Sequence, residues 1–242
     1  MSTKTFLTAE WRKLAMAQYA VEPAALEPYL PAGVELDLFQ GKCYVSLVGF
    51  IFDKVRLKGL PIPFHTRFEE VNLRFYVRRQ NAYGSWRRGV VFVCELVPRA
   101  AITIVANTFY EEPYATVPMR HEILHTTSEL NVSDEWKYCG VWYSMSVDAA
   151  PLPVAIRAGS VEEFITEHYW GFTKRSDGGT SQYEVKHPSW VTYPVRKYAI
   201  DADFGALYGT RFAGLNGVEP DSVLLAEGSA VSVDSGTRLP LG

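Results

Sequence analysis

The segment that decides the fold lies at residues 68–77 and reads Phe68-Glu69-Glu70-Val71-Asn72-Leu73-Arg74-Phe75-Tyr76-Val77. Successive side chains of a β-strand point to opposite faces, so the polar residues of this segment share one face. These are Glu70, Asn72, Arg74 and Tyr76. The other face, mostly apolar, suits a core, whereas the polar face meets either solvent or a polar cavity. The segment therefore predicts a strand and leaves open whether its polar face is solvated or binds a ligand.

The composition of the 242-residue chain is that of a globular protein with a large core, since 48% of its residues are apolar and 21% charged. The net charge of −3 argues against a nucleic-acid partner, which requires a concentrated basic face. No apolar run is long enough to cross a bilayer, and the first residues lack a signal-peptide core, so we expect no membrane partner. Cys43, Cys94 and Cys139 are widely spaced and predict buried thiols in a reducing compartment. We therefore expect a cytoplasmic protein.

Strand-like segments dominate the chain. We expect strands at 12–21, 42–55, 68–79, 88–97, 100–110, 117–127, 131–147, 181–187, 190–201 and 221–234. Short helices are predicted at 23–30, after a capping box at 160–163, and at 203–208. No linker or internal repeat divides the chain, which predicts a single domain over residues 1–242. Many closely spaced strands with few helices predict a mainly β (α+β) fold, either a barrel or a sandwich.

The motif His121-Glu122-Ile123-Leu124-His125 matches the H-E-x-x-H pattern of zinc metalloproteases. That chemistry requires a helix, because helical spacing brings both imidazoles to one metal ion. Here the surroundings favour a strand, on which four residues span about 13 Å. We therefore expect no metal site. The remaining histidines, His65, His168 and His187, have no ligand spacing and are interpreted as structural or surface groups.

Other motifs that would identify a reaction are missing from the sequence. There is no Gly-x-Ser-x-Gly nucleophile elbow, no phosphate-binding P-loop and no dinucleotide-binding glycine fingerprint. The turn at Asp177-Gly178-Gly179-Thr180 lacks the form of a phosphate cradle. We therefore expect no cofactor.

Four segments in order form a recognisable set: residues 18–37 (QYAVEPAALEPYLPAGVELD), 68–77, 109–119 (FYEEPYATVPM) and 164–169 (FITEHY). Together they resemble the YqjF-like family of unknown function, within the acetoacetate decarboxylase-like superfamily. The resemblance runs from about residue 6 to past residue 200. It implies antiparallel strands curled into a cone-like β-barrel with a few short helices and a central cavity. It also implies that the polar face of residues 68–77 looks into that cavity.

The decarboxylases of this superfamily form a Schiff base on a cavity lysine whose pKa is lowered by burial and by an adjacent lysine. In that family the lysine pair follows a proline in a Tyr-Pro-Lys-Lys motif. The matching positions here are Pro113, Tyr114 and Ala115, so both lysines are missing from their places. Among the other lysines Lys186 is the strongest candidate for a replacement, and we do not expect it to act as one.

The resemblance carries two other groups over. Arg12 matches an arginine near the start of the first strand, and Glu70 matches a carboxylate on the strand at 68–77. A second cavity carboxylate falls near Ser46 and is lost. With Lys13 beside it, Arg12 also fits a solvated strand end. The implied cavity residues are Glu70 as candidate general base, Tyr114 as candidate proton donor, and Arg12, Asn72, Arg74 and Tyr76 as substrate-binding groups.

Three functions stay open. In the first, the barrel binds a small carboxylate or carbonyl compound, with a guanidinium as anchor and Glu70 accepting a hydroxyl. In the second, it is an enzyme without Schiff-base chemistry, a lyase, isomerase or hydrolase acting on a keto or hydroxy acid, with Glu70 as general base. In the third, it is a non-catalytic assembly module. Fold alone does not choose between binding and catalysis, and the sequence leaves open whether the chain forms a homo-oligomer.

Overall fold

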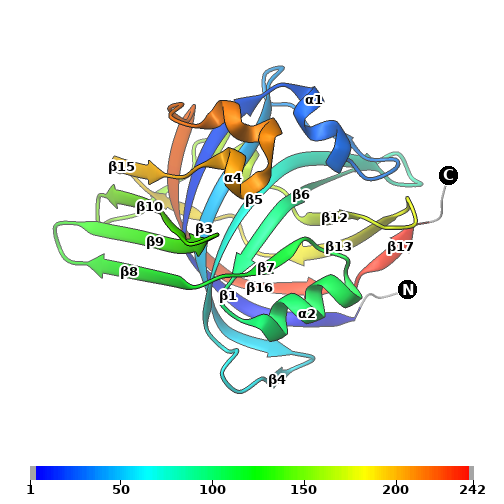
Figure 1. Ribbon diagram of the computed structural model, residues 1–242, viewed down its shortest axis with the longest axis horizontal. Coiled ribbons are helices and arrows are strands. Elements are labelled where there is room, and N and C mark those ends of the chain that lie inside the picture. Colours follow the sequence, from blue (N-terminus) through cyan, green and yellow to red (C-terminus); the bar gives the residue numbers. More distant parts are fainter. Residues whose placement is uncertain (1–3, 240–242) are drawn as a thin grey trace.

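A closed, curved sheet forms the body of the molecule (Figure 1), a computed structural model that describes residues 4–239. In order of hydrogen-bonded neighbours the sheet runs through β16 (Ser222–Asp234), β1 (Thr5–Val21), β3 (Cys43–Leu57), β5 (Phe68–Gln80), β6 (Trp86–Val97), β12 (Trp170–Lys174) and β13 (Thr180–Lys186). β13 then pairs with β16, where Val185 lies opposite Val233. The sheet thus returns to its first strand and encloses an interior, and we call it the barrel.

Further strands extend the barrel or cover it. Its edges gain β2 (Glu35–Leu36), β4 (Leu60–Pro61), β7 (Tyr114–Thr116), β11 (Val154–Ala155), β14 (Val191–Tyr193) and β17 (Thr237–Leu239). A second sheet has the order β15 (Val195–Asp201), β10 (Val141–Ala149), β9 (Leu130–Tyr138) and β8 (Met119–His125). This sheet packs on the outside of the barrel, where Trp136 and Met145 share a buried cluster with Leu73 and Phe75 of β5.

The helices are short and fill the connections. They are α1 (Pro23–Leu26) with the 3₁₀ turn η1 (Glu27–Tyr29), α2 (Ala100–Phe109), α3 (Val161–Thr166), α4 (Phe204–Tyr208) and the 3₁₀ turn η2 (Thr210–Leu215). The capping box begins α3 as predicted, because the Ser160 hydroxyl accepts a hydrogen bond from the Glu163 N–H. The Glu163 carboxylate accepts from the Gly159 N–H, one residue before the position that the motif predicts. Within residues 4–239, none of the helices combines the length and the apolar character needed to cross a bilayer.

Two hydrophobic clusters lie on the two sides of the barrel wall. The outer cluster contains Val71, Leu73 and Phe75 of β5, packed against the second sheet, α4 and η2. The inner cluster contains Tyr76 of β5, with Met16, Phe50 and Phe52 from the neighbouring strands. The alternation along residues 68–77 therefore divides the strand as predicted. Its apolar face packs on the outer core, and its polar face meets the barrel interior.

The segment at 100–110 is not the strand that we predicted from its β-branched residues. It forms α2, which lies over the barrel next to β7 (Figure 1). Ala101, Ile102, Val105 and Ala106 recur at helical spacing and line the inside of the barrel. Packing of this stripe on the interior outweighs the weak local preference for a strand.

Three smaller expectations are also wrong, concerning one strand, one cysteine and the direction of the strands. The segment at 131–147 is two strands, β9 and β10, joined by a tight turn at Cys139 and Gly140, both with positive φ. Cys139 is therefore exposed at the turn, whereas Cys43 is buried. The sheet is also not wholly antiparallel, because β12 and β7 both run parallel to β6.

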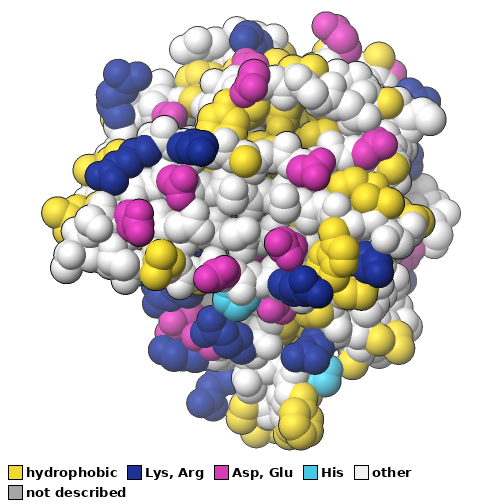
Figure 2. Space-filling model, turned by 60° about the vertical axis from the view of Figure 1, so that its left-hand side comes forward, with side chains coloured by type: hydrophobic (Ala, Val, Ile, Leu, Met, Phe, Trp, Pro, Cys, Tyr) yellow, Lys and Arg dark blue, Asp and Glu magenta, His cyan; other side chains and the backbone are white. Residues whose placement is uncertain are grey.

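The surface charges are mixed on the face shown in Figure 2. Lysine and arginine side chains lie among aspartate and glutamate side chains there, and neither sign forms a continuous patch. Across the described surface, several basic side chains are paired with acidic ones, as Arg78 is with Glu35 and Lys54 with Glu10. This face of the molecule therefore presents no field of a single sign.

Candidate functional site

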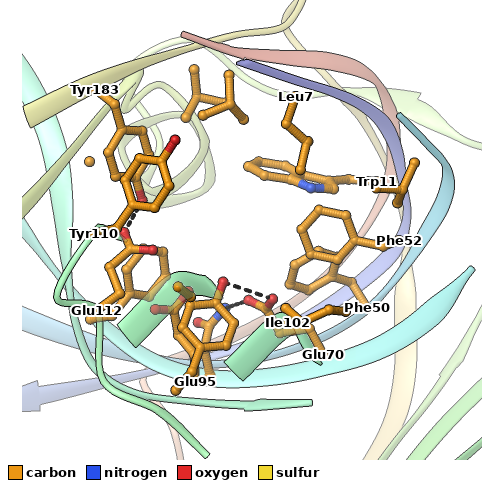
Figure 3. Close-up of a pocket in the computed structure, with 18 of the residues that line it drawn as sticks. Leu7, Trp11, Phe50, Phe52, Glu70, Glu95, Ile102, Tyr110, Glu112 and Tyr183 are labelled. Atoms are coloured by element: carbon orange, nitrogen blue, oxygen red, sulfur yellow. Dashed lines mark hydrogen bonds between the residues drawn. The ribbon is translucent and has the colours of Figure 1, made fainter. Parts of the chain in front are cut away.

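A cavity of about 350 Å³ lies inside the barrel and is mostly apolar. One wall is aromatic: Trp11 of β1 and Phe50 and Phe52 of β3 stand together on one side of it (Figure 3). The Trp11 ring meets the two phenylalanine rings edge to face, with ring centres 5.6 and 5.9 Å apart. The Trp11 indole N–H is buried and has no hydrogen-bond partner within residues 4–239. This wall suits the apolar part of a small organic molecule, and the Trp11 N–H can donate one hydrogen bond to that molecule.

Three glutamates line the cavity from the foot of this aromatic wall to the opposite side: Glu70 of β5 next to Phe50, then Glu95 of β6, then Glu112 just before β7 (Figure 3). Strand pairing explains how they meet. Asn72 lies opposite Glu95 across the β5–β6 ladder, and Glu95 lies beside Tyr114 in the parallel β6–β7 pair. Residues from three separate stretches of the chain therefore form one acidic cluster.

Amide and phenol groups hold these carboxyl groups in place. The Asn72 amide donates to Glu70 Oε1 at 2.9 Å, and the Tyr114 hydroxyl donates to Glu70 Oε2 at 3.4 Å. The Tyr183 hydroxyl donates to Glu112 Oε1 at 2.6 Å. Gly171 of β12 makes room for Tyr183, since a Cβ atom there would lie 2.2 Å from Cζ of its ring. The Glu95 Oε2 atom is buried without a hydrogen-bond partner in the described part of the chain.

Burial raises the pKa of all three carboxyl groups. The pKa of Glu70 and that of Glu112 rise to about 7, and that of Glu95 rises well above its ordinary value. Loss of hydration is the largest cause, and the charge of Glu112 adds to it for both Glu70 and Glu95. The hydrogen bonds from Asn72 and Tyr114 act in the opposite direction on Glu70. The cluster therefore holds protons near neutral pH, titrates together, and can both donate and accept hydrogen bonds.

Arg74 brings a cation to the same cavity. The residue is only 8% exposed, and its Nε is buried without a hydrogen-bond partner. No hydrogen bond or ion pair joins its guanidinium to another of residues 4–239, and its Cζ lies 5.9 Å from the centre of the Tyr76 ring. A buried charge without a counterion is unfavourable. Arg74 is therefore a ready site for an anion.

His168 also lines the cavity and packs against Tyr76, with the two ring centres 4.8 Å apart. Its Nε2 lies 3.1 Å from Asp37 Oδ2, which also accepts from Arg88 Nε at 2.6 Å. Burial alone would raise the pKa of Asp37, but the hydrogen bonds from His168 and Arg88 bring it below its ordinary value. Burial lowers the pKa of His168 to about 4, so the ring is neutral at pH 7. Its Nδ1 is buried and has no partner among the described residues.

A protein-family model matches most of this chain. The DUF2071 model, an uncharacterized conserved protein, matches residues 8–230. This chain belongs to the DUF2071 family. Among curated proteins it is similar to the uncharacterized protein YqjF of Bacillus subtilis (strain 168), with 28% identity over 187 residues, 75% of this chain and 72% of the relative.

Comparison with solved structures identifies the type of fold of this DUF2071 protein. Acetoacetate decarboxylase from Legionella pneumophila superposes with a TM-score of 0.66 at 13% identity, covering 99% of this chain and 90% of that one. The enduracididine biosynthesis enzyme MppR complexed with pyruvate gives a TM-score of 0.65 at 12% identity, covering 99% and 92%. At these identities the likeness concerns the fold, which is therefore acetoacetate decarboxylase-like, as the sequence resemblance implies.

The cavity of the DUF2071 protein contains most of the residues predicted for it. Glu70, Asn72, Arg74 and Tyr114 all line it. Tyr76 lies on the same face of β5 but does not line the cavity, because Phe164 and His168 pack against its ring. Its hydroxyl lies 2.6 Å from the Ser46 hydroxyl. Tyr76 thus packs against His168 and lies beside the Arg74 guanidinium.

The structure does not bring Arg12 to the cavity. Its side chain is 35% exposed and forms ion pairs with Glu10 at 2.8 Å and with Glu227 at 3.5 Å. The reason is a bulge in β1 between Arg12 and Ala15, where Lys13 has a φ of 54°. Trp11 points into the barrel before the bulge, so Arg12 points out.

The H-E-x-x-H motif lies on strand β8, as predicted from its surroundings, and on the outside of the barrel wall. His121 Nδ1 is 3.2 Å from Glu69 Oε1 on the outer face of β5, and His125 Nε2 donates to the Pro151 carbonyl at 3.0 Å. Among residues 4–239, no three histidine, cysteine, aspartate or glutamate side chains are placed to share a metal ion. The two histidines thus form hydrogen bonds with different partners.

Sequence reasoning missed three cavity residues, Glu95, Glu112 and His168, and also Asp37, the buried partner of His168. Glu95 is the one charged residue in the otherwise apolar run 89–97, a signal that could have been noticed. Glu112 lies within the segment that carried the family resemblance, two residues before Tyr114. His168 lies in another such segment, but we interpreted it as structural. Its partner Asp37 is 131 positions away in the chain, and no local pattern joins the two.

Proposed function

We propose that this protein binds a small organic acid in the barrel cavity. The ligand's carboxylate lies on Arg74, and a carbonyl or hydroxyl oxygen lies at the Glu70–Tyr114 end. The observation that carries the proposal is the Arg74 guanidinium, which is buried, borders the cavity and has no counterion in the described part of the chain. Guanidinium groups bind carboxylates through paired, charge-assisted hydrogen bonds.

The spacing of the polar groups indicates the shape of the ligand. Arg74 and Glu70 lie four residues apart on the same face of β5, so their Cα atoms are about 13 Å apart. Asn72 lies between them, and the side chains at both ends are long enough to converge on one molecule. The aromatic wall at Trp11 and Phe50 accommodates a short apolar body. A cavity of about 350 Å³ falls within the usual range for small-molecule sites.

Schiff-base chemistry has no place in the proposed function. Tyr114 stands at the position that matches the reactive lysine, and the cavity-lining residues within 4–239 include no lysine. Lys186 is 52% exposed and lies 2.5 Å from the Asp234 carboxylate. The hydrogen bond to Asp234 raises the pKa of Lys186, whereas an imine-forming amine needs a lowered pKa.

The test of the binding function compares acids with their esters. We expect small 2-keto and 2-hydroxy acids to raise the melting temperature, and their methyl esters to have no effect. Arg74→Gln should weaken acid binding by about 10- to 100-fold, since a hydrogen-bonded charge contributes about 1.5–3 kcal/mol. Arg78→Gln is the matched control, because Arg78 lies on the same strand but is exposed and paired with Glu35. Equal binding of acids and esters, or full binding by Arg74→Gln, would contradict the proposal.

A catalytic function is the second candidate, and the raised pKa of Glu70 favours it. A carboxyl group with a pKa of about 7 is matched to proton transfer near neutral pH. The Glu70 carboxylate would remove a proton from the carbon next to a ligand carbonyl. The pKa of Tyr114 is raised well above its ordinary value by burial, so its hydroxyl stays protonated and can hydrogen-bond the resulting enolate oxygen.

Deuterium exchange tests this second candidate directly. Incubation of a keto acid with the protein in D₂O should replace the α-protons of the acid with deuterium, which proton NMR detects as a loss of their signal. Glu70→Gln should abolish this protein-dependent exchange. Glu69→Gln is the control, because Glu69 lies on the outer face of β5. Binding without any exchange would leave the protein as a binding protein and remove the catalytic role of Glu70.

A further inference from the structure

We propose that a second pocket, next to the cavity, binds a phosphate group that the ligand carries at the far end of an apolar chain. Arg238 and Lys58 supply the positive charge, and the hydroxyl groups of Thr173 and Ser181 complete the set of donors. This inference rests on the proposed binding function for the inner end of the ligand. It names the class of ligand, organic acids that also bear a phosphate.

The second pocket has a volume of about 590 Å³ and shares a wall with the cavity. Six residues line both spaces: Phe6, Leu57, Ile62, Val105, Tyr110 and Tyr183. Tyr110 and Tyr183 lie next to each other on the side of the cavity away from Trp11 (Figure 3), with ring centres 6.3 Å apart. The two spaces therefore adjoin each other, and we call the second one the outer pocket.

Three adjacent strands present a polar row to the outer pocket. Ser181 of β13 lies opposite Thr173 of β12 on one side and opposite Arg238 of β17 on the other. Tyr183 follows Ser181 by two positions on the same strand, so both side chains point to one face. Tyr183 lines the cavity and Ser181 lines the outer pocket. One face of the sheet thus runs from the first space into the second, and a ligand lying along it can reach both.

The side chains of this row have no partner of their own in the described part of the chain. Thr173 is only 7% exposed, and its hydroxyl forms no hydrogen bond with another of residues 4–239. The Ser181 hydroxyl and the Arg238 guanidinium likewise have no hydrogen bond or ion pair among these residues. A buried hydroxyl without a partner favours a ligand that accepts a hydrogen bond from it. The row therefore offers two hydroxyl donors and a cation to a molecule in the outer pocket.

Lys58 lines the outer pocket from another part of the chain. It lies at the tight turn between β3 and β4, with a φ of 50°, and its backbone N–H donates to the Phe6 carbonyl at 2.8 Å. On the way to β17, the Ser235 N–H donates to the Lys4 carbonyl at 2.9 Å. The first residues of the barrel thus hold the Lys58 turn and the segment before Arg238 at one pocket. The Lys58 ammonium group forms no ion pair with another of residues 4–239.

The chemistry of these groups favours a phosphate. A phosphate has three strong acceptor oxygens and close to two negative charges at pH 7, whereas a carboxylate has two oxygens and one charge. An arginine fork, a lysine ammonium and two hydroxyls supply donors for all three oxygens. Apolar side chains line another part of the outer pocket, among them Leu57, Leu60, Ile62 and Val105. The segment of the ligand between its two acidic groups is therefore expected to be apolar.

Calorimetry at pH 7 with three acids of one chain length tests the outer pocket. These are 8-phosphonooctanoate, nonanedioate and nonanoate, which end in a phosphonate, a carboxylate and a methyl group on the same methylene chain. We expect the phosphonate to bind about 10- to 100-fold more tightly than nonanoate, with nonanedioate between them. Arg238→Gln should weaken phosphonate binding about tenfold and leave the affinity for nonanoate within about twofold. Arg196→Gln, at an exposed arginine of β15 in the second sheet, is the matched control.

Thr173→Val distinguishes a built site from a general attraction of charges, because it removes a hydroxyl and no charge. We expect it to weaken phosphonate binding about fivefold, as the loss of one hydrogen bond does, with the affinity for nonanoate retained. Unchanged phosphonate binding in this variant would contradict the donor set proposed for the outer pocket.

Octylphosphonate, which lacks the carboxylate, separates the outer pocket from the binding function. Its ³¹P NMR resonance should broaden or shift with the wild type and with Arg74→Gln, and should be unaffected by Arg238→Gln. If this result is obtained while no acid depends on Arg74, the outer pocket is supported and the binding function fails. If nonanoate binds through Arg74 but the phosphonate adds no affinity, or if Arg238→Gln keeps the gain, the phosphate site is overturned and the binding function stands.

Discussion

Glu69 and Glu70 are neighbours in the chain and differ in almost every physical property. Glu69 points to the outer face of β5, where His121 lies 3.2 Å away, and this hydrogen bond is the largest cause of its lowered pKa. Glu70 points into the barrel, where burial among other carboxyl groups raises its pKa to about 7. The alternation of one strand thus separates a carboxylate that stabilises the fold from a carboxyl group that the fold holds at a cost in stability. Such a cost is typical of functional sites.

The largest expected effect is a gain of stability in Glu70→Gln above pH 7. A carboxyl group whose folded pKa is raised from 4.5 to about 7 favours folding only while it is protonated, so its stability is lost as the pH rises between these values. A tenfold change in proton affinity corresponds to about 1.4 kcal/mol, and sharing of protons within the cluster reduces the sum. We therefore expect Glu70→Gln to be about 2–3 kcal/mol more stable than the wild type at pH 8, measured by urea unfolding.

The pH dependence of this effect provides its control. At about pH 3 and below, Glu70 is protonated in both the folded and the unfolded state, so the difference between Glu70→Gln and the wild type should vanish. A constant difference at every pH would show that the substitution acts through packing, and it would contradict the assignment of a raised pKa to Glu70.

Packing around the cavity is expected to give an effect of intermediate size. A Cβ atom at position 171 would lie 2.2 Å from the Tyr183 ring, so Gly171→Ala must displace the phenol that donates to Glu112. Overpacking of this kind costs roughly 1–3 kcal/mol. Gly214→Ala is the matched control, because nothing lies within 4 Å of its Cβ position. Equal unfolding midpoints for the two variants would contradict this account of the inner wall.

The parts of this molecule that were predictable from sequence are those set by local alternation. The strand at 68–77, its two faces and the strand nature of the H-E-x-x-H segment follow from periodicity and neighbouring residues. The position of Arg12 does not, because the bulge in β1 depends on a distant strand. Gly228 of β16 lies so close that a Cβ there would be 2.0 Å from the Trp11 carbonyl oxygen. The partnership of Asp37 and His168, and the meeting of Glu95 with Glu112, are likewise products of tertiary packing alone.

On the outer face the expected effect is smaller and of opposite sign. Glu69→Gln removes the hydrogen-bonded partner of His121, but it also relieves repulsion with Asp134, whose pKa is raised to about 7 by burial, with the charge of Glu69 adding to that rise. We expect a loss of no more than about 1 kcal/mol at pH 7. Because the pKa of Glu69 is lowered, this contribution is present above its unfolded value and is lost as the pH falls through the folded value. A gain of stability in this variant at pH 7 would contradict the stabilising role of Glu69 and, with it, the difference between the outer and inner faces of β5.

For the last prediction we expect no effect at all: the protein should form no covalent adduct with acetoacetate. Incubation with acetoacetate and borohydride should leave the mass of the protein unchanged, because reduction can trap only an imine formed on a lysine. The cavity-lining residues in the described part of the chain include none, and Tyr114 cannot form one. An acetoacetate decarboxylase treated in parallel provides the positive control. An adduct on this protein, mapped by peptide mass spectrometry, would identify a lysine that reaches the carbonyl group. Glu70 would then be a partner of that lysine, and the comparison between the two faces of β5 would no longer account for the chemistry of the inner one.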